Sequence, residues 1–227
     1  MVKYFIHIPK NGGMTLRRNP TIMKHCQAMH PQFHKSSEYT LAVREKMHAN
    51  GDHEGYEHAR WRDTSDIVKR GTTFAIVRNP WARVVSRYYF AKKVIEVEKD
   101  SIVYGNTDYA DISSFEAFLE ERHKWGGVDY MWHRAVRGWY PAFEHVCDDK
   151  GKVRCDILRL EHLATDLTAY LGTLINPEPR NVTGVLKGRW QDVYDDKTIQ
   201  IVADWYQKDI DYWGFDFDTA ARKNYWK

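Results

Sequence analysis

The stretch Thr72-Thr73-Phe74-Ala75-Ile76-Val77-Arg78-Asn79-Pro80 decides the fold of this chain. Its first part, residues 72–77, is apolar or β-branched without interruption, which is typical of a strand buried on both faces of a parallel sheet. Asn79 is suited to cap a helix and Pro80 to stand in its first turn, so a helix is predicted to follow the strand directly. Apolar residues recur after the cap at helical spacing, which supports this helix: Trp81, Val84, Val85 and Tyr88.

Residues 3–8 form a second apolar run, which enters the segment Pro9-Lys10-Asn11-Gly12-Gly13-Met14-Thr15-Leu16. We expect a buried strand over 3–8, a loop, and a helix from Thr15 to about Cys26. The pattern predicts further helices over 38–49, 63–69, 113–124, 129–138, 161–174 and 195–208, and further strands over 55–59, 142–147 and 153–159. This alternation predicts an α/β fold with a mainly parallel sheet. The length of 227 residues predicts a single domain over residues 1–227.

The composition is that of a globular protein and argues against several classes of function. The net charge of +3 is a weak bias that does not favour nucleic-acid binding. Cys147 and Cys155 bracket a predicted hairpin tip where a disulfide is conceivable, but three cysteines do not make a disulfide framework, and free thiols are favoured. No apolar run approaches the ~18 residues of a membrane span. Because no signal or anchor is visible, we expect a cytoplasmic protein of a bacterium or virus, or a protein of the Golgi lumen if the chain is trimmed.

The glycine-rich segment 9–16 has the composition of an anion-binding loop. Gly12 and Gly13 let the backbone approach an anion closely, and the N–H groups at the start of the following helix point towards it. Lys10 adds a mobile positive charge. In a Walker loop, Lys follows the last glycine and precedes Ser or Thr, so the order found here does not favour Mg²⁺-dependent nucleotide chemistry. The alternative is a glycine-rich turn with a surface lysine.

Arg78 and Ser86 form a second candidate anion site. Arg78 follows the strongest strand, at the carboxyl end where open α/β sheets bind ligands, and its guanidinium suits bidentate contacts to phosphate. Ser86 lies two turns into the next helix, where its hydroxyl is suited to bind the same phosphate. The alternative makes Arg78 a salt-bridge partner and Ser86 an ordinary residue of the helix surface.

Together these segments resemble the sulfotransferases that use 3′-phosphoadenosine 5′-phosphosulfate (PAPS). Segment 9–16 is similar to their 5′-phosphosulfate loop, although Asn11 and Met14 stand where the family usually has Thr or Ser. Arg78-Asn79-Pro80 followed by Ser86 is similar to their 3′-phosphate motif. The likeness is greatest to the carbohydrate branch, of the heparan sulfate/uronyl 2-O-sulfotransferase type. It implies a three-layer P-loop-like sandwich with a central, mainly parallel sheet flanked by helices, and it implies these donor-binding residues: Lys10, Asn11, Gly12, Gly13, Met14, Thr15, Leu16, Arg78 and Ser86.

The resemblance implies further site residues outside these two segments. His58 stands twenty residues before the motif arginine, where the family has a His that acts as general base. His53 and Glu57 are alternative bases, and His58 is otherwise a surface or capping histidine. A loop that closes over the 3′-phosphate and adenosine, or alternatively a solvated turn, is expected at Lys187, Gly188 and Arg189.

The implied reaction transfers a sulfuryl group from PAPS to an acceptor hydroxyl, releases the 3′,5′-bisphosphate (PAP) and uses no metal. The expected acceptor is a saccharide, with no nucleic-acid partner, and the oligomeric state is left open. One basic and aromatic segment is a candidate lining of the acceptor cleft or, equally, a helix with a mixed surface: Lys124, Trp125, Trp132, His133, Arg134, Arg137, Trp139 and Tyr140. Two rival functions are a P-loop-like kinase or other phosphoryl transferase, and a non-catalytic nucleotide-binding protein.

Overall fold

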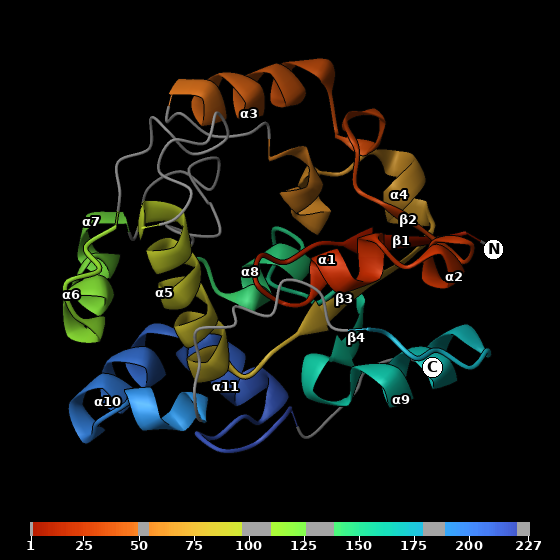
Figure 1. Cartoon of the computed structure of the whole chain (residues 1–227). Helices are drawn as coiled ribbons and strands as arrows, with labels where there is room; N and C mark the ends of the chain where they lie inside the picture. Colours follow the sequence, from red (N-terminus) through yellow and green to blue (C-terminus); the bar gives the residue numbers. More distant parts are fainter. Residues whose placement is uncertain (1, 50–54, 97–109, 126–138, 179–188, 222–227) are drawn as a thin grey trace.

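The structure is a computed structural model that describes residues 2–49, 55–96, 110–125, 139–178 and 189–221 (Figure 1). These residues form a four-stranded sheet in the order β2–β1–β3–β4, in which every neighbouring pair of strands is parallel. The prediction of an α/β fold with a parallel sheet flanked by helices is confirmed. The strands are β1 Lys3–Ile6, β2 Cys26–Ala28, β3 Thr72–Val77 and β4 Asp156–Arg159.

Helices are distributed between the strands and after them. The α-helices are α1 Gly13–Arg17, α2 Pro20–Met23, α3 Ser37–Ala49, α4 Asp66–Arg70, α5 Pro80–Glu96, α6 Phe115–Glu120, α7 Arg122–Trp125, α8 Ala142–Val146, α9 Leu163–Leu171, α10 Asp196–Trp205 and α11 Gln207–Trp213. Short 3-10 turns are η1 Pro31–Phe33, η2 Tyr56–His58, η3 Trp61–Asp63, η5 Leu160–His162 and η6 Trp190–Val193. Within the described ranges, no helix combines the length and the apolar character that a membrane crossing needs.

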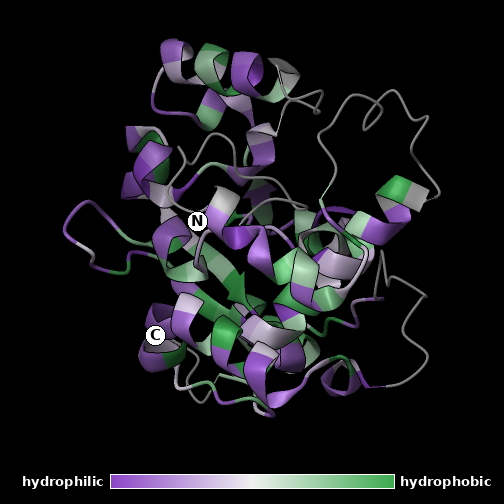
Figure 2. Ribbon diagram, turned by 90° about the vertical axis from the view of Figure 1, so that its left-hand side faces the viewer, coloured by the Kyte–Doolittle hydropathy of each residue, from purple (hydrophilic) through white to green (hydrophobic). Residues whose placement is uncertain are grey.

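Strand β3 is buried on both faces, as its sequence predicts. Ala75 and Val77 belong to one hydrophobic cluster, and Phe74 and Ile76 belong to another. Because successive side chains of a strand point to opposite faces, the two clusters lie on opposite sides of the sheet. Helices α1, α2 and α9 supply residues to one cluster, and α5, α8, α10 and α11 supply residues to the other, which gives three layers. Figure 2 shows the strands as a hydrophobic centre with more polar helices outside.

The junction of β3 and α5 forms as predicted. The Asn79 side-chain oxygen accepts hydrogen bonds from the backbone N–H groups of Trp81 and Ala82, at 3.0 and 3.1 Å. Pro80 is the first residue of α5. The apolar stripe that follows is buried, and it fixes the rotation of α5 on the sheet.

The predicted helix over 15–26 is wrong in its length. Helix α1 ends at Arg17, because Asn19 starts a new helix by accepting hydrogen bonds from Thr21 N and Ile22 N, at 3.0 and 3.2 Å. Pro20 opens α2, and the chain then enters β2, a strand that was not predicted. β2 pairs with β1 at the edge of the sheet.

Two predicted strands are helical turns instead. Within residues 55–59, Tyr56–His58 form η2, which follows Gly55 in the left-handed conformation at φ 62°. Within the segment 142–147, residues Ala142–Val146 form α8, because the buried carboxylate of Asp209 accepts hydrogen bonds from Ala142 N and Phe143 N, at 2.7 and 2.8 Å. This cap comes from α11, so the local pattern cannot reveal it.

The other predicted helices and strands are present in the structure, although several of them begin or end at different residues. The helix predicted over 38–49 is α3, and the strand predicted over 153–159 contains β4. The helix predicted over 63–69 is shorter, as α4, and begins after Ser65. The segments 113–124, 161–174 and 195–208 each divide into a helix with a neighbouring short turn or second helix. The predicted helix 129–138 lies outside the described residues.

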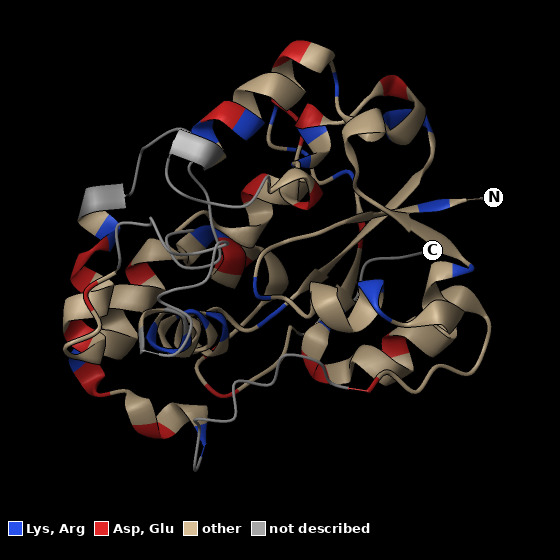
Figure 3. Ribbon diagram, turned by 45° about the horizontal axis from the view of Figure 1, so that its top comes forward, with Lys and Arg blue, Asp and Glu red and all other residues tan. Residues whose placement is uncertain are grey.

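The cysteines are free, so no disulfide joins Cys147 to Cys155. The hairpin tip between them is confirmed by an antiparallel bridge of Cys147 with Val153. Acidic and basic residues are intermingled on α3 and the other outer helices (Figure 3), which matches the weak net charge.

Candidate functional site: the loop after β1 and its neighbours

The glycine-rich segment forms a tight loop between β1 and α1. The Asn11 N–H donates to the Ile8 carbonyl at 3.3 Å. Lys10 and Gly12 both adopt the left-handed conformation, at φ 66° and 79°. Gly12 stands at the N-cap of α1 and offers no side-chain cap to its first turn. The loop therefore presents the N-terminal backbone of α1 on the side of the sheet where ligands bind in this fold class.

Gly12 is required by its left-handed backbone, and Gly13 by the side chain packed against it. A Cβ on Gly13 would lie 1.7 Å from Nε2 of His7, and a Cβ on Gly12 would lie 2.6 Å from Cδ1 of Leu160. The His7 imidazole occupies the space that a side chain at position 13 would need. Any substitution of Gly13 therefore displaces His7.

Asn11 has a structural contact that its place in the motif does not reveal. Its side chain is buried, and Nδ2 donates a hydrogen bond to the Ile76 carbonyl at 2.8 Å. The loop is thereby tied to β3. The Asn11 backbone N–H donates to the Ile8 carbonyl and its side-chain amide is directed to the sheet, so both donor groups of Asn11 hold the loop in shape.

The remaining loop residues differ in their exposure. The side chain of Leu16 is in the hydrophobic core and Thr15 is buried, whereas Met14 is partly exposed. The contribution of Leu16 to an anion site is therefore limited to its backbone.

Lys10 and Arg78 lie together, as the two motifs predict. β1 and β3 are parallel neighbours, so the residues after their carboxyl ends are adjacent. Arg78 Nη1 donates a hydrogen bond to the Lys10 carbonyl at 3.2 Å. The Lys10 ammonium lies 4.2 Å from the centre of the Phe90 ring on α5. Ser86 is one turn before Phe90 and is partly exposed, so it lies on the face of α5 that is turned towards Lys10.

This region has an excess of positive charge. Burial, followed by the charges of Arg78, Arg87 and Lys93 in that order, lowers the pKa of Lys10 to about 7. Burial also lowers the pKa of Arg78 to about 10, against the attraction of Glu161. Like charges are held together here at an electrostatic cost, which a bound anion would remove.

Arg83 supports the same loop from beneath, and sequence reasoning missed it. Its buried guanidinium donates from Nε to the Pro9 carbonyl at 3.1 Å and from Nη1 to the Tyr140 carbonyl at 2.9 Å. Arg87, one turn later, donates to the Tyr206 hydroxyl at 3.3 Å. The signal was present in the sequence, since both arginines interrupt the apolar stripe of α5 at helical spacing.

Asn79 does more than cap α5. Its Nδ2 donates to the carbonyls of Asp216, Phe217 and Thr219, at 2.9, 3.3 and 2.8 Å. The C-terminal segment 216–219 is thereby held against the end of β3. Arg189 lies beside this segment, with Nη2 3.9 Å from the Asp218 carboxylate, and is exposed. Lys187 and Gly188 lie outside the described residues.

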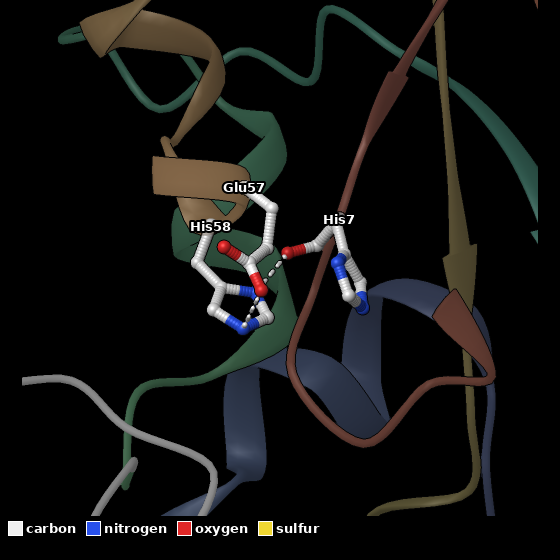
Figure 4. A group of neighbouring side chains, drawn as sticks. All are labelled: His7, Glu57 and His58. Carbon is white, nitrogen blue, oxygen red and sulfur yellow. Dashed lines mark hydrogen bonds and ion pairs between the residues drawn. The ribbon is translucent and has the colours of Figure 1, made fainter. Parts of the chain in front are cut away.

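The region around His58 forms a second group of chemically active side chains (Figure 4). His58 Nδ1 lies 2.9 Å from the His7 carbonyl oxygen. A carbonyl only accepts, so Nδ1 carries the proton and Nε2 carries the lone pair. Nε2 lies 3.9 Å from Oε1 of Glu57, which is also 3.2 Å from the Arg17 guanidinium. His53 lies outside the described residues.

His58 and the glycine-rich loop are joined through His7. The rings of His7 and His58 are 4.4 Å apart between centres, and the His7 ring also lies against Gly13. The structure therefore brings the proposed base next to the loop. Of the aromatic segment before α8, Trp139 is in the core below Arg87, 4.0 Å from its guanidinium, and Tyr140 is partly exposed; positions 126–138 lie outside the described residues.

Comparison with known proteins identifies the family of the chain. Neither the search of curated proteins nor the search of solved structures gives a match. The sequence model of the sulfotransferase family matches residues 4–216, which include the loop, η2, β3, α5 and Arg189. With nearly the whole chain matched, the protein belongs to the sulfotransferase family.

Proposed function

We propose that this sulfotransferase takes its sulfuryl group from PAPS and transfers it to a hydroxyl of a saccharide, with His58 as general base. The observation that carries the proposal is the hydrogen bond from Arg78 to the Lys10 carbonyl. It joins the two motifs that resemble the 5′- and 3′-phosphate sites of PAPS enzymes. A donor with phosphate at both ends would satisfy both motifs at once.

The donor contacts follow from this geometry. Lys10, Thr15 and the backbone N–H groups of residues 12–16 bind the 5′-phosphosulfate at the start of α1. Arg78 and Ser86 bind the 3′-phosphate. Lys187, Gly188 and Arg189 close over the 3′-phosphate and the adenosine, a position supported by the place of Arg189 beside segment 216–219.

The reaction is an in-line displacement at sulfur. The acceptor oxygen forms a bond to sulfur while the bond from sulfur to the bridging oxygen of PAPS breaks. His58 Nε2 takes the acceptor proton, since its Nδ1 is already bonded to the His7 carbonyl. Protonated Lys10 stabilises the charge that develops on the departing PAP. No metal enters this reaction, because Lys10 and Arg78 neutralise the leaving group.

The experiment is an acceptor screen with ³⁵S-labelled PAPS. Desulfated and partly sulfated glycosaminoglycan fragments form one arm, and a tyrosine peptide and a simple alcohol form two others. Label is expected on a saccharide, with one PAP released for each sulfate transferred. Label on the peptide or the alcohol alone would overturn the saccharide assignment.

Two further outcomes would overturn the proposed reaction as well as the proposed acceptor. Tight PAP binding with no label on any acceptor would identify a non-catalytic nucleotide-binding protein. Transfer of phosphate from γ-³²P-labelled ATP with Mg²⁺, and no transfer of sulfate, would identify a phosphoryl transferase.

A further inference from the structure

We propose that His7, Glu57 and His58 form a binding site for a divalent transition-metal ion, with Zn²⁺ as its preferred occupant. Each residue offers one ligand atom, and the three atoms lie within 4.8 Å of one another. Figure 4 shows the three side chains gathered in one place, with His7 from the residue just after β1 and the other two from η2. Two imidazoles and one carboxylate are a donor set that zinc commonly takes.

The ligands are already oriented in the way that metal sites require. A metal-binding histidine usually donates its other ring N–H to a carbonyl or carboxylate, which fixes the ring. His58 does so, from Nδ1 to the His7 carbonyl. The Glu57 carboxylate is held by Arg17 at 3.2 Å. The His7 ring is held by Phe5, which stacks on it at 5.5 Å, and by the space that Gly13 leaves.

Closing the site requires the three ligand atoms, which lie within 4.8 Å of one another, to move closer together. Ligands bound at about 2.1 Å in a tetrahedron are about 3.4 Å apart, whereas His58 Nε2 and Glu57 Oε1 are 3.9 Å apart. The side chain of Glu57 is 20% exposed and has three rotatable bonds, so it can supply this movement. A water molecule completes the coordination from the exposed side.

The carboxylate decides whether the ion is held. The surroundings are cationic, since Arg17 lies 3.2 Å from the Glu57 carboxylate, and burial, helped by the charges of Arg83 and Arg60, lowers the pKa of His145 close to the group. In such a field two neutral imidazoles alone hold a dication weakly, and Glu57 supplies the opposing charge. Replacement of Glu57 by Gln, which removes the charge but nearly keeps the shape of the side chain, therefore weakens binding of the metal ion.

A bound ion would also occupy Nε2 of His58. This consequence, unlike the site itself, rests on the proposed function, in which Nε2 takes the acceptor proton. Zinc is then an inhibitor of sulfate transfer, and EDTA reverses the inhibition.

The test begins with zinc alone, in the absence of PAPS. The metal-depleted full chain is titrated with Zn²⁺ by calorimetry and by competition with a chromophoric chelator. One equivalent is expected to bind, with affinity reduced at least about tenfold in Glu57→Gln and in His58→Gln. The matched control is His25→Gln, an exposed histidine outside the group, which should bind as the unaltered chain does. Unchanged affinity in Glu57→Gln and His58→Gln would overturn the site.

Cobalt gives an independent measurement. Co²⁺ at this site should give visible d–d absorption bands of four- or five-coordinate nitrogen and oxygen ligation, and these bands should be absent in His58→Gln. Circular dichroism and PAP binding of each variant establish that it is folded. Bands that persist in His58→Gln would place the ion elsewhere and overturn the proposal. Because neither measurement involves sulfate transfer, failure of the metal site leaves the proposed reaction to be judged by its own assay.

Discussion

Arg83, which is buried in helix α5, donates a hydrogen bond to the carbonyl of Pro9 at 3.1 Å. Pro9 is the residue before Lys10, so a helix on one face of the sheet fixes the start of the glycine-rich loop. The second hydrogen bond of Arg83, to the Tyr140 carbonyl, ties the same guanidinium to the segment before α8. Three parts of the chain that are far apart in sequence meet at this one side chain.

Replacement of Arg83 by Met should therefore destabilise the fold. Met keeps much of the side-chain volume but leaves the carbonyls of Pro9 and Tyr140 without this donor. Buried acceptors left unsatisfied cost about 1–3 kcal/mol each, so we expect the free energy of unfolding to fall by about 2–4 kcal/mol in urea titrations. Arg70→Met is the control, since Arg70 is exposed at the end of α4, and should change the free energy of unfolding by less than about 0.5 kcal/mol. Equal effects of the two variants would contradict the role of Arg83.

Replacement of Lys10 by Ala should remove turnover while the protein stays folded. The ammonium is expected to stabilise the departing PAP, and a single preorganised donor of this kind contributes about 10²–10³ in rate. Lys10→Met retains most of the length of the side chain, whose ammonium lies over the Phe90 ring, and should lose as much kcat as Lys10→Ala. The measurement is single-turnover transfer of ³⁵S from PAPS. Retained turnover in both variants would remove Lys10 from the mechanism.

The helices and strands that were predicted correctly from the sequence are those determined by residues close together in the chain. The uninterrupted apolar run of β3 and the cap at Asn79 specify a buried strand and its helix without help from distant residues, and both are confirmed. Helix α8 was predicted as a strand because its cap, Asp209, comes from α11. The adjacency of Lys10 and Arg78 could be predicted from the parallel-sheet rule, but the anchoring of Asn11 to Ile76 could not. Such contacts depend on the register between neighbouring strands and loops, which a single sequence does not reveal.

Replacement of Arg78 by Ala should chiefly weaken donor binding. The guanidinium is expected to bind the 3′-phosphate, and a charged hydrogen bond of this type contributes about 1.5–3 kcal/mol. We expect the dissociation constant for PAP to rise by about 10–150-fold by calorimetry. Adenosine 5′-monophosphate, which differs from PAP only in lacking the 3′-phosphate, provides the matched ligand, and its affinity should change much less. An equal loss for both ligands would assign Arg78 to the loop, through the Lys10 carbonyl, and not to the 3′-phosphate.

The affinity for PAP should depend on pH through Lys10. The pKa of Lys10 in the unliganded protein is lowered to about 7, first by burial and then by Arg78. A bound anion favours the protonated form, so PAP raises this pKa. Below pH 7 the lysine is already charged and the affinity is level. Above pH 7 binding must take up a proton, and the affinity should fall by up to about tenfold for each pH unit.

Calorimetry between pH 7 and 9, in buffers of different ionisation enthalpy, measures this proton uptake directly. In Lys10→Met the proton uptake should disappear, and uptake that persists would assign it to another group.

Replacement of Asn79 by Asp should loosen the C-terminal segment while the helix cap is kept. An Asp side chain still accepts from the N–H groups of Trp81 and Ala82, which Asn79 now caps. It cannot donate to the carbonyls of residues 216, 217 and 219, and its charge would face those oxygens. We expect the free energy of unfolding to fall by about 2–4 kcal/mol and amide hydrogen exchange to accelerate in segment 216–219 more than in α5.

Since Arg189 borders segment 216–219, the affinity of Asn79→Asp for PAP should fall as well. Faster exchange confined to the first turn of α5, with segment 216–219 unchanged, would mean that Asn79 acts only as a cap.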